Sequence, residues 1–327
     1  MRAIRLFSAA VMALGFAAGT AGATAKDTTL ALVAYSTPKE AYAKLIPAFQ
    51  GTPAGKSVSF TQSYGASGDQ ARAVIQGLPA DVVEFSLEPD LTDLVKAGLV
   101  SKGWDRGAYH GMVSDSVVVF VVRNGNPKHI KSWNDLTRPG IQVITPNPFT
   151  SGGARWNVMA AYGAQLKLGK TPAQAVAYLT KLFRNVAVQD KSARDALNTF
   201  LSGKGDVLLT YENEAWLAQH KGQPVFYTIP RSTILIENPI AITNGKNQAA
   251  ARSFLHFLYT PQAQAIFGET GYRPVVKSVA AKFKYPVRPG LFTIGFVGGW
   301  EKVEKQFFDP RSGIMAKVER AVGGVTG

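Results

Sequence analysis

Residues 147–157, with the sequence Asn-Pro-Phe-Thr-Ser-Gly-Gly-Ala-Arg-Trp-Asn, contain groups suited to binding an anion. Ser151 stands where a helix N-cap is expected, and Gly152 and Gly153 follow as the first helical residues. Glycine leaves its backbone N–H open to a ligand, and the start of a helix carries partial positive charge. An oxyanion could therefore bind directly to backbone donors here. The simpler interpretation is a tight connection with an ordinary serine cap.

A strand before this stretch and a helix after it would hold it in place. Residues 141–144 form a short apolar run typical of a strand, and residues 156–168 carry apolar side chains at helical spacing. The same order recurs along the chain, with Ser or Thr expected at the helix starts Thr37, Ser67, Ser151 and Ser192. Each is more simply a structural cap when taken alone. Because Gly68 and Gly152 follow two of them, we expect several helix starts to converge on one anion.

Strands and helices alternate through the rest of the chain. Strands are expected at residues 29–34, 57–61, 81–85, 117–122, 141–144, 186–188, 206–210, 233–236 and 240–243, with a loop at 62–66 and a break at Pro239. Helices are expected after the four caps, at residues 88–96, 171–183, 248–259 and 261–267, from Tyr211 onward, and after Trp300. This α/β alternation predicts mostly parallel sheets flanked by helices, with ligands at the carboxyl ends of strands.

The length of 327 residues allows two lobes with separate cores. The apolar run 117–122 would be the first crossing between them, and residues 233–243 would be the return. The predicted division is a signal peptide at 1–25, one lobe from 26–116 together with 238–327, and a second lobe at 117–237.

The first 25 residues have the features of a secretory signal. Arg2 and Arg5 precede an apolar segment from Leu6 to Ala18, and small residues follow. No later segment is apolar for long enough to span a bilayer. The chain has no cysteine, which excludes disulfides, thiolate chemistry and a cysteine-linked lipid anchor. We therefore expect a soluble, exported protein with no membrane insertion.

The formal charge of +14 suits an anionic partner, and it falls to +12 when Arg2 and Arg5 are removed with the signal. Nucleic acid and a membrane surface are possible partners for such a charge. Lys and Arg are, however, scattered along the chain, and we find no run of basic residues with interleaved aromatics. We therefore expect small anions, and no nucleic acid, as the ligands.

Enzymatic chemistry has little support in the sequence. The four histidines, His110, His129, His220 and His256, lack the spacing of metal ligands. Residues 65–68 lack the spacing of a nucleophile elbow, and there is no phosphate-binding P-loop. We expect no catalytic residue, no metal and no cofactor, and an exported hydrolase is the distant alternative.

Several blocks of the sequence resemble the sulfate- and thiosulfate-binding proteins of bacterial ABC importers. The blocks are Ser63–Gln70, Asn147–Asn157, Asp190–Arg194, Asn198–Phe200, Gly205–Ala215 and Tyr272–Pro274. The similarity runs in order from about Leu30 to Trp300. It implies a two-lobed periplasmic-binding-protein fold of type II, a monomer in the periplasm that closes around sulfate and delivers it to an ABC transporter permease.

The resemblance also implies which residues hold the anion. They are Ser36, Ser67, Ser151, Gly152, Gly153, Ala193 and Tyr211. Ser67 would contribute its hydroxyl and amide, Ser151 its hydroxyl, and Gly152, Gly153 and Ala193 their amides. Ser36 stands where the family usually has an aspartate used through its amide, so the ordering of that loop by the aspartate side chain would be lost. Tyr211 stands where the family has a tryptophan whose indole N–H donates to the anion.

This tyrosine affects the expected selectivity. Fully ionised sulfate only accepts hydrogen bonds, whereas phosphate keeps a proton near neutral pH, and a site made only of donors leaves that proton unpaired at a cost of about 1–3 kcal/mol. Because a phenol can accept as well as donate, we expect weaker rejection of protonated anions than with an indole. Thiosulfate, molybdate, tungstate and phosphate remain alternative ligands.

Three large side chains near the expected site are assigned structural roles. We expect Arg155 and Arg194 each to pair with a carboxylate or a helix terminus rather than with the anion. We expect Trp156 to belong to the hydrophobic core.

Overall fold

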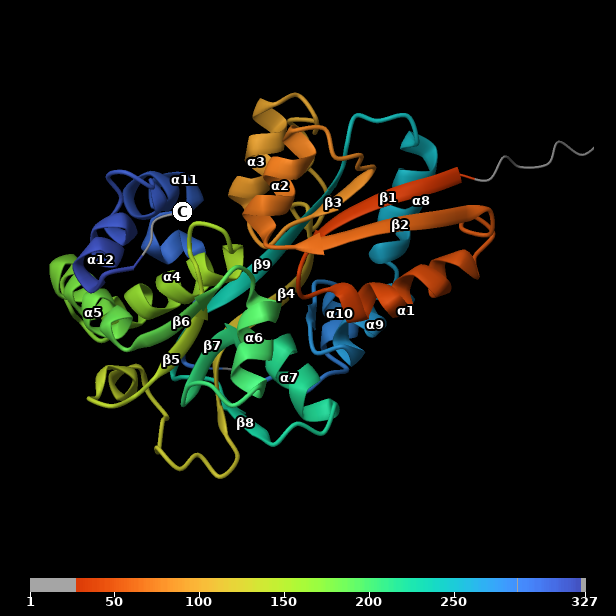
Figure 1. The fold of residues 1–327 in the computed structure, drawn as a ribbon. Coiled ribbons are helices and arrows are strands. Elements are labelled where there is room, and N and C mark those ends of the chain that lie inside the picture. The colour runs from red at the N-terminus through yellow and green to blue at the C-terminus, as the bar shows by residue number, and fades with distance from the viewer. Residues whose placement is uncertain (1–27, 287, 325–327) are drawn as a thin grey trace, which may run out of the picture.

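In the computed structural model, which describes residues 28–286 and 288–324, helices flank a curled sheet (Figure 1). The predicted signal peptide lies outside the described residues. The strands are β1 (Thr28–Tyr35), β2 (Val58–Gly65), β3 (Val82–Glu84), β4 (Met112–Arg123), β5 (Val143–Pro146), β6 (Val186–Asp190), β7 (Val207–Tyr211), β8 (Val225–Thr228), β9 (Ser232–Ile242), β10 (Arg273–Pro274) and β11 (Gly290–Phe292).

Every predicted helix is present, but the helix at 277–280 was not expected and the one expected after Trp300 is divided in two. The helices are α1 (Lys39–Gln50), α2 (Ser67–Ile75), α3 (Glu88–Lys96), α4 (Gly152–Lys167), α5 (Pro172–Arg184), α6 (Ala193–Leu201), α7 (Glu212–His220), α8 (Gln248–Leu258), α9 (Pro261–Glu269), α10 (Lys277–Ala280), α11 (Trp300–Val303) and α12 (Ile314–Val322). Short 3₁₀ segments at Trp133–Thr137 and Ile294–Val297 and a π segment at Glu304–Phe308 were not expected from the sequence. Within the described part of the chain, no helix is both long and apolar enough to cross a bilayer.

Two parallel groups of strands are joined by two antiparallel strands. The order is β2-β1-β3-β9-β4-β7-β5-β6. Strands β2, β1 and β3 run parallel to one another, as do β7, β5 and β6. Strand β9 pairs antiparallel with β3 and β4, and β4 pairs antiparallel with β7. We call the β1–β3 group with α1–α3 and α8–α10 the first lobe, and the β5–β7 group with α4–α7 the second lobe.

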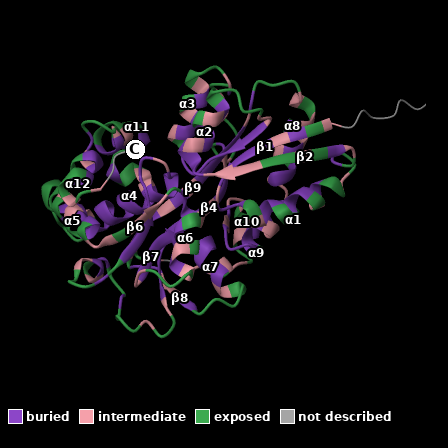
Figure 2. Cartoon of the chain, viewed as in Figure 1, coloured by how far each residue is buried: buried purple, intermediate pink, exposed green. Residues whose placement is uncertain are grey.

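The two joining strands are among the most buried parts of the chain (Figure 2). Residues 117–122 of β4 are all buried, as their run of Val and Phe predicts. The expected break at Pro239 is wrong, because β9 continues through it. Pro239 pairs with Met112 where the register of β4 shifts, and its carbonyl accepts a hydrogen bond from Phe85. A proline is tolerated at such an irregularity because no ladder N–H is required there.

The loop expected at residues 62–66 is also mostly strand. Strand β2 pairs residue by residue with β1 as far as Gly65, so the polar residues of its second half continue the sheet edge. Partial exposure of this edge strand explains why its sequence lacks the apolar pattern of a buried strand.

The C-terminal residues pack differently from the predicted division. Trp300 contacts Trp156 edge-to-face at 4.6 Å between ring centroids, Phe307 contacts Tyr162 in the same way, and α12 lies beside α5 (Figure 1). Residues 300–322 thus share a core with the second lobe, whereas the sequence placed 238–327 in the first. The remaining lobe boundaries stay predictions.

Two of the four predicted helix caps are confirmed. The hydroxyls of Ser151 and Ser192 accept hydrogen bonds from the amides of Ala154 and Asp195. The other two are wrong, because the cap positions of α1 and α2 are Pro38 and Ala66. The hydroxyls of Thr37 and Ser67 bond instead to the side chains of Tyr272 and Asp90. A buried tertiary partner has displaced the local cap in both cases.

Candidate anion-binding site

The predicted site residues converge where the two lobes meet. Ser36 follows β1, Ser67 begins α2, Gly152 begins α4 and Ala193 begins α6, while Tyr211 ends β7. These are carboxyl ends of parallel strands and the starts of the helices that follow them. The arrangement matches the general location of ligand sites in α/β folds.

Close contacts connect the residues contributed by the second lobe. A methyl group at Gly153 would lie 2.7 Å from Cε2 of Tyr211 and 3.3 Å from Cβ of Ala193. The amide of Arg194 donates to the hydroxyl of Ser36 in the first lobe, with 3.5 Å between the atoms. The structure therefore brings Ser36, Gly153, Ala193 and Tyr211 together.

Ser86 connects the remaining residues and was missed by sequence reasoning. Its amide donates to Oγ of Ser67 at 2.9 Å, and its own Oγ lies 2.5 Å from the hydroxyl of Tyr211. A methyl group at Gly152 would lie 2.5 Å from the same Oγ. Ser86 comes just after the predicted strand 81–85, so its position at the carboxyl end of a strand was the signal that could have identified it.

Of the seven predicted site residues, five have a backbone N–H that lacks a protein acceptor among the described residues. They are Ser36, Ser67, Gly152, Gly153 and Ala193. First-turn amides have no acceptor within their own helix, and all of these residues except the half-buried Ser36 are buried. Buried N–H groups are normally paired, so a cluster of unpaired ones favours an external acceptor such as an oxyanion.

Other expected donors are already used by the protein. The amide of Gly68 donates to the carbonyl of Thr150 across the lobes at 3.2 Å, so the expectation that it is open to a ligand is wrong. The hydroxyl of Ser67 donates to Asp90 at 2.5 Å, and burial raises the pKa of that carboxyl. The hydroxyl of Ser151 caps α4. Contacts from these two hydroxyls to an anion stay predictions.

Tyrosine and threonine hydroxyls hold the loop that carries Ser36. The hydroxyl of Thr37 lies 2.7 Å from that of Tyr272, and Tyr35 donates to the same Tyr272 oxygen at 3.5 Å. All three residues are buried. These contacts hold the loop on both sides of Ser36. In the family that the sequence resembles, the side chain of an aspartate at this position orders the loop.

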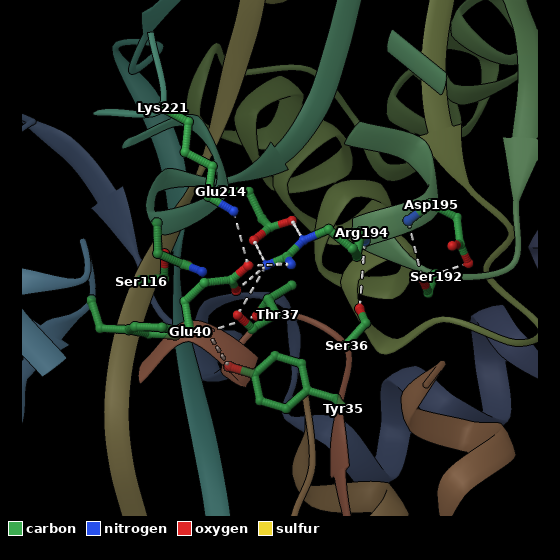
Figure 3. A network of polar contacts seen from close by, with 12 residues as sticks. Tyr35, Ser36, Thr37, Glu40, Ser116, Ser192, Arg194, Asp195, Glu214 and Lys221 are labelled. Carbon is green, nitrogen blue, oxygen red and sulfur yellow. Dashed lines mark hydrogen bonds and ion pairs between the residues drawn. The ribbon is translucent and has the colours of Figure 1, made fainter. Parts of the chain in front are cut away.

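Arg194 lies beside the site, where its guanidinium pairs with two carboxylates and also donates to the carbonyl of Thr37 (Figure 3). It donates twice to Glu214 of α7 and twice to Glu40 of α1, at 2.7–2.8 Å. Burial raises the pKa of Glu214, and Arg194 offsets only part of that effect. Burial opposes ionisation of Glu40 too, but the hydrogen bonds from Arg194 prevail and lower its pKa. The predicted carboxylate pairing of Arg194 is confirmed, and it joins the lobes.

Arg155 and Trp156 also have the predicted structural roles. Arg155 pairs with Glu304 at 2.7 Å and donates to the carbonyl of Pro148 at 2.9 Å. Trp156 is buried, and its indole N–H donates to the carbonyl of Ser86. Both Arg155 and Arg194 are therefore neutralised by carboxylates of the protein. No group of three metal-ligating side chains occurs within the part of the chain that the structure describes.

Comparison with known proteins agrees with this geometry. Residues 30–273 match the family model of the bacterial extracellular solute-binding proteins. A sulfate-binding protein of Synechococcus elongatus is 41% identical over 93% of this chain and 90% of its own length. A thiosulfate-binding protein of Pseudomonas aeruginosa is 36% identical over 93% of this chain and 96% of its own.

A solved structure extends the similarity to three dimensions. The sulfate-binding protein SubI from Mycobacterium tuberculosis superposes with a TM-score of 0.84 at 45% identity, covering 86% of this chain and 100% of SubI. The solved structures similar to this chain are periplasmic binding proteins of type II, which confirms the predicted two-lobed α/β fold. On sequence and structure together, the chain belongs to the bacterial extracellular solute-binding proteins.

Proposed function

We propose that this protein is a monomeric periplasmic receptor that captures sulfate between its two lobes and delivers it to the permease of an ABC transporter. The observation that carries the proposal is the cluster of unpaired backbone N–H groups from Ser36, Ser67, Gly152, Gly153 and Ala193. These donors come from four separate segments of the chain and from both lobes, so a single anion would hold the lobes together. The names of its relatives support sulfate as the ligand.

Neutral donors suit a receptor better than an enzyme. A dianion taken out of water loses a large solvation energy, which many oriented dipoles can replace. Arg155 and Arg194 are paired with glutamates and so do not add charge to the ligand. Because no full charge contacts the anion, it can leave when the lobes open. We therefore propose binding and release, without catalysis.

Thiosulfate is the second candidate, since a thiosulfate-binding protein is 36% identical over nearly the whole chain. It has the charge and tetrahedral shape of sulfate, with one sulfur in place of an oxygen. The same backbone N–H groups could donate hydrogen bonds to either anion.

We expect sulfate to stabilise the purified protein against heat. At a ligand concentration of 100 times Kd, mass action adds about 2.7 kcal/mol, which corresponds to a rise in Tm of about 5 °C or more. Differential scanning fluorimetry with sulfate, thiosulfate, molybdate, tungstate and phosphate measures this rise for each anion. A large shift with molybdate or tungstate and none with sulfate or thiosulfate would overturn the proposal.

A further inference from the structure

Two buried hydroxyls from opposite lobes form a pair at the site. Ser86, in the first lobe, and Tyr211, in the second, are each 1% exposed, and their oxygens lie 2.5 Å apart. Two hydrogen bonds of its backbone hold Ser86 in place: its amide donates to Oγ of Ser67, and its carbonyl accepts from the indole N–H of Trp156. The pair thus forms only when the lobes are together.

The pair can donate and accept at the same time. Two hydroxyls carry two protons, and one of these lies between the oxygens. If Ser86 donates to Tyr211, the phenol proton points outward, and if Tyr211 donates to Ser86, the serine proton does. Either arrangement leaves an outward donor together with an oxygen lone pair. An indole at position 211 would offer only a donor. Burial raises the pKa of Tyr211, so the phenol keeps its proton at neutral pH.

Both oxygens lie against the glycines whose amides are unpaired. A methyl group at Gly152 would lie 2.5 Å from Oγ of Ser86, and one at Gly153 would lie 3.3 Å from the hydroxyl of Tyr211. The hydroxyl pair therefore lies against the start of α4, whose first two amides are the proposed anion donors. We infer that the pair meets an oxygen of an anion bound there.

We propose that Ser86 is a specificity residue of this site, which acts with Tyr211 so that tetrahedral oxyanions carrying a proton are also admitted. The inference rests on the proposed function, and phosphate is the representative ligand. The phosphate O–H donates to the lone pair of one hydroxyl while the other hydroxyl donates to a phosphate oxygen. Fully ionised sulfate needs only the donor. Loss of Ser86 should therefore weaken phosphate binding more than sulfate binding.

Isothermal titration calorimetry at pH 7 with sulfate and with phosphate tests this on the full-length mature protein. The unmodified protein should bind sulfate more tightly than phosphate, with phosphate binding still measurable. Ser86→Ala should lower phosphate affinity about 10-fold or more, since an unpaired polar hydrogen costs about 1–3 kcal/mol. The same variant should lower sulfate affinity only about 3-fold. Tyr211→Phe should act similarly, and the double variant should lose little more than either single one, because the two hydroxyls act as a unit.

Tyr178→Phe is the matched control, because it removes a buried tyrosine hydroxyl that bonds to the carbonyl of Trp133. It should leave the ratio of sulfate to phosphate affinity unchanged. Equal losses for the two anions in Ser86→Ala would overturn the role of Ser86, as would sulfate binding by the unmodified protein without any phosphate binding. Failure to bind sulfate or thiosulfate at all would instead reject the proposed function.

Discussion

Replacing Gly152 by alanine is expected to weaken sulfate binding by about 10- to 100-fold without unfolding the protein. The added methyl group would lie 2.5 Å from Oγ and 2.6 Å from Cβ of Ser86, and 2.8 Å from a methyl carbon of Leu87. Rotation of the serine side chain moves the Oγ but not the Cβ, so the clash cannot be relieved locally. Overpacking of this kind costs about 1–3 kcal/mol.

The cost should fall on the closed form alone. Gly152 belongs to the second lobe, whereas Ser86 and Leu87 belong to the first, so the lobes can relieve the clash by separating. In the proposed function, sulfate binding requires donors from both lobes, so it would have to overcome the clash. The unliganded protein should keep its Tm.

Gly107→Ala is the control for this variant. A methyl group at Gly107 would meet no atom within 4 Å, so this variant should bind sulfate as the unmodified protein does. Calorimetry gives the affinities, and thermal unfolding without sulfate gives the stabilities. Unchanged sulfate affinity in Gly152→Ala would contradict the closure argument. A Tm loss as large as the loss of binding energy would show that the contact belongs to the fold.

The parts of the site that the sequence predicted are those fixed by local pattern. Ser151, Gly152 and Gly153 were placed at a helix start because the cap, the glycines and the helical periodicity all lie within one short stretch. Ser192 was placed in the same way, and both caps are confirmed. Local chemistry was sufficient because the capped amides lie only three residues away.

The parts that the sequence could not predict depend on contacts between distant segments. The hydroxyl of Ser67 bonds to Asp90 and not to its own helix, and that of Thr37 bonds to Tyr272, 235 residues away. Ser86 enters the site only because its strand lies opposite Gly152 of the other lobe. The position of the C-terminal helices was unpredictable for the same reason. Their aromatic side chains pack against the second lobe, and no local sequence pattern indicates which lobe they cover.

Replacing Arg194 by methionine is expected to destabilise the protein by about 3–5 kcal/mol, the usual effect of removing one partner from a buried ion pair. Glu214 is fully buried, and both of its oxygens bond to Arg194. The variant would leave this carboxylate without a partner inside the second lobe. Chemical denaturation of the unliganded protein measures the loss. A stability equal to that of the unmodified protein would show that Glu214 is satisfied without Arg194.

Glu40→Gln separates the role of Arg194 in joining the lobes from its role in neutralising the buried Glu214. Glu40 lies in the other lobe and keeps 28% of its side chain exposed, so its loss should weaken lobe closure and lower sulfate affinity a few-fold. Stability of the unliganded protein should change little. Lys221→Met, which removes a more exposed partner of the same carboxylate, should change neither quantity measurably.

The pH dependence follows from the direction of the Glu40 shift. Its pKa in the folded protein lies below the ordinary value of 4.5, so its contribution to closure is complete above that value and disappears as the pH falls through the lowered pKa. The sulfate affinities of the unmodified protein and of Glu40→Gln should therefore differ at neutral pH and converge in acid below pH 4.5. Titrations across that range test this directly. A constant difference down to strongly acidic pH would mean that the ionised carboxylate is not what joins the lobes through Arg194.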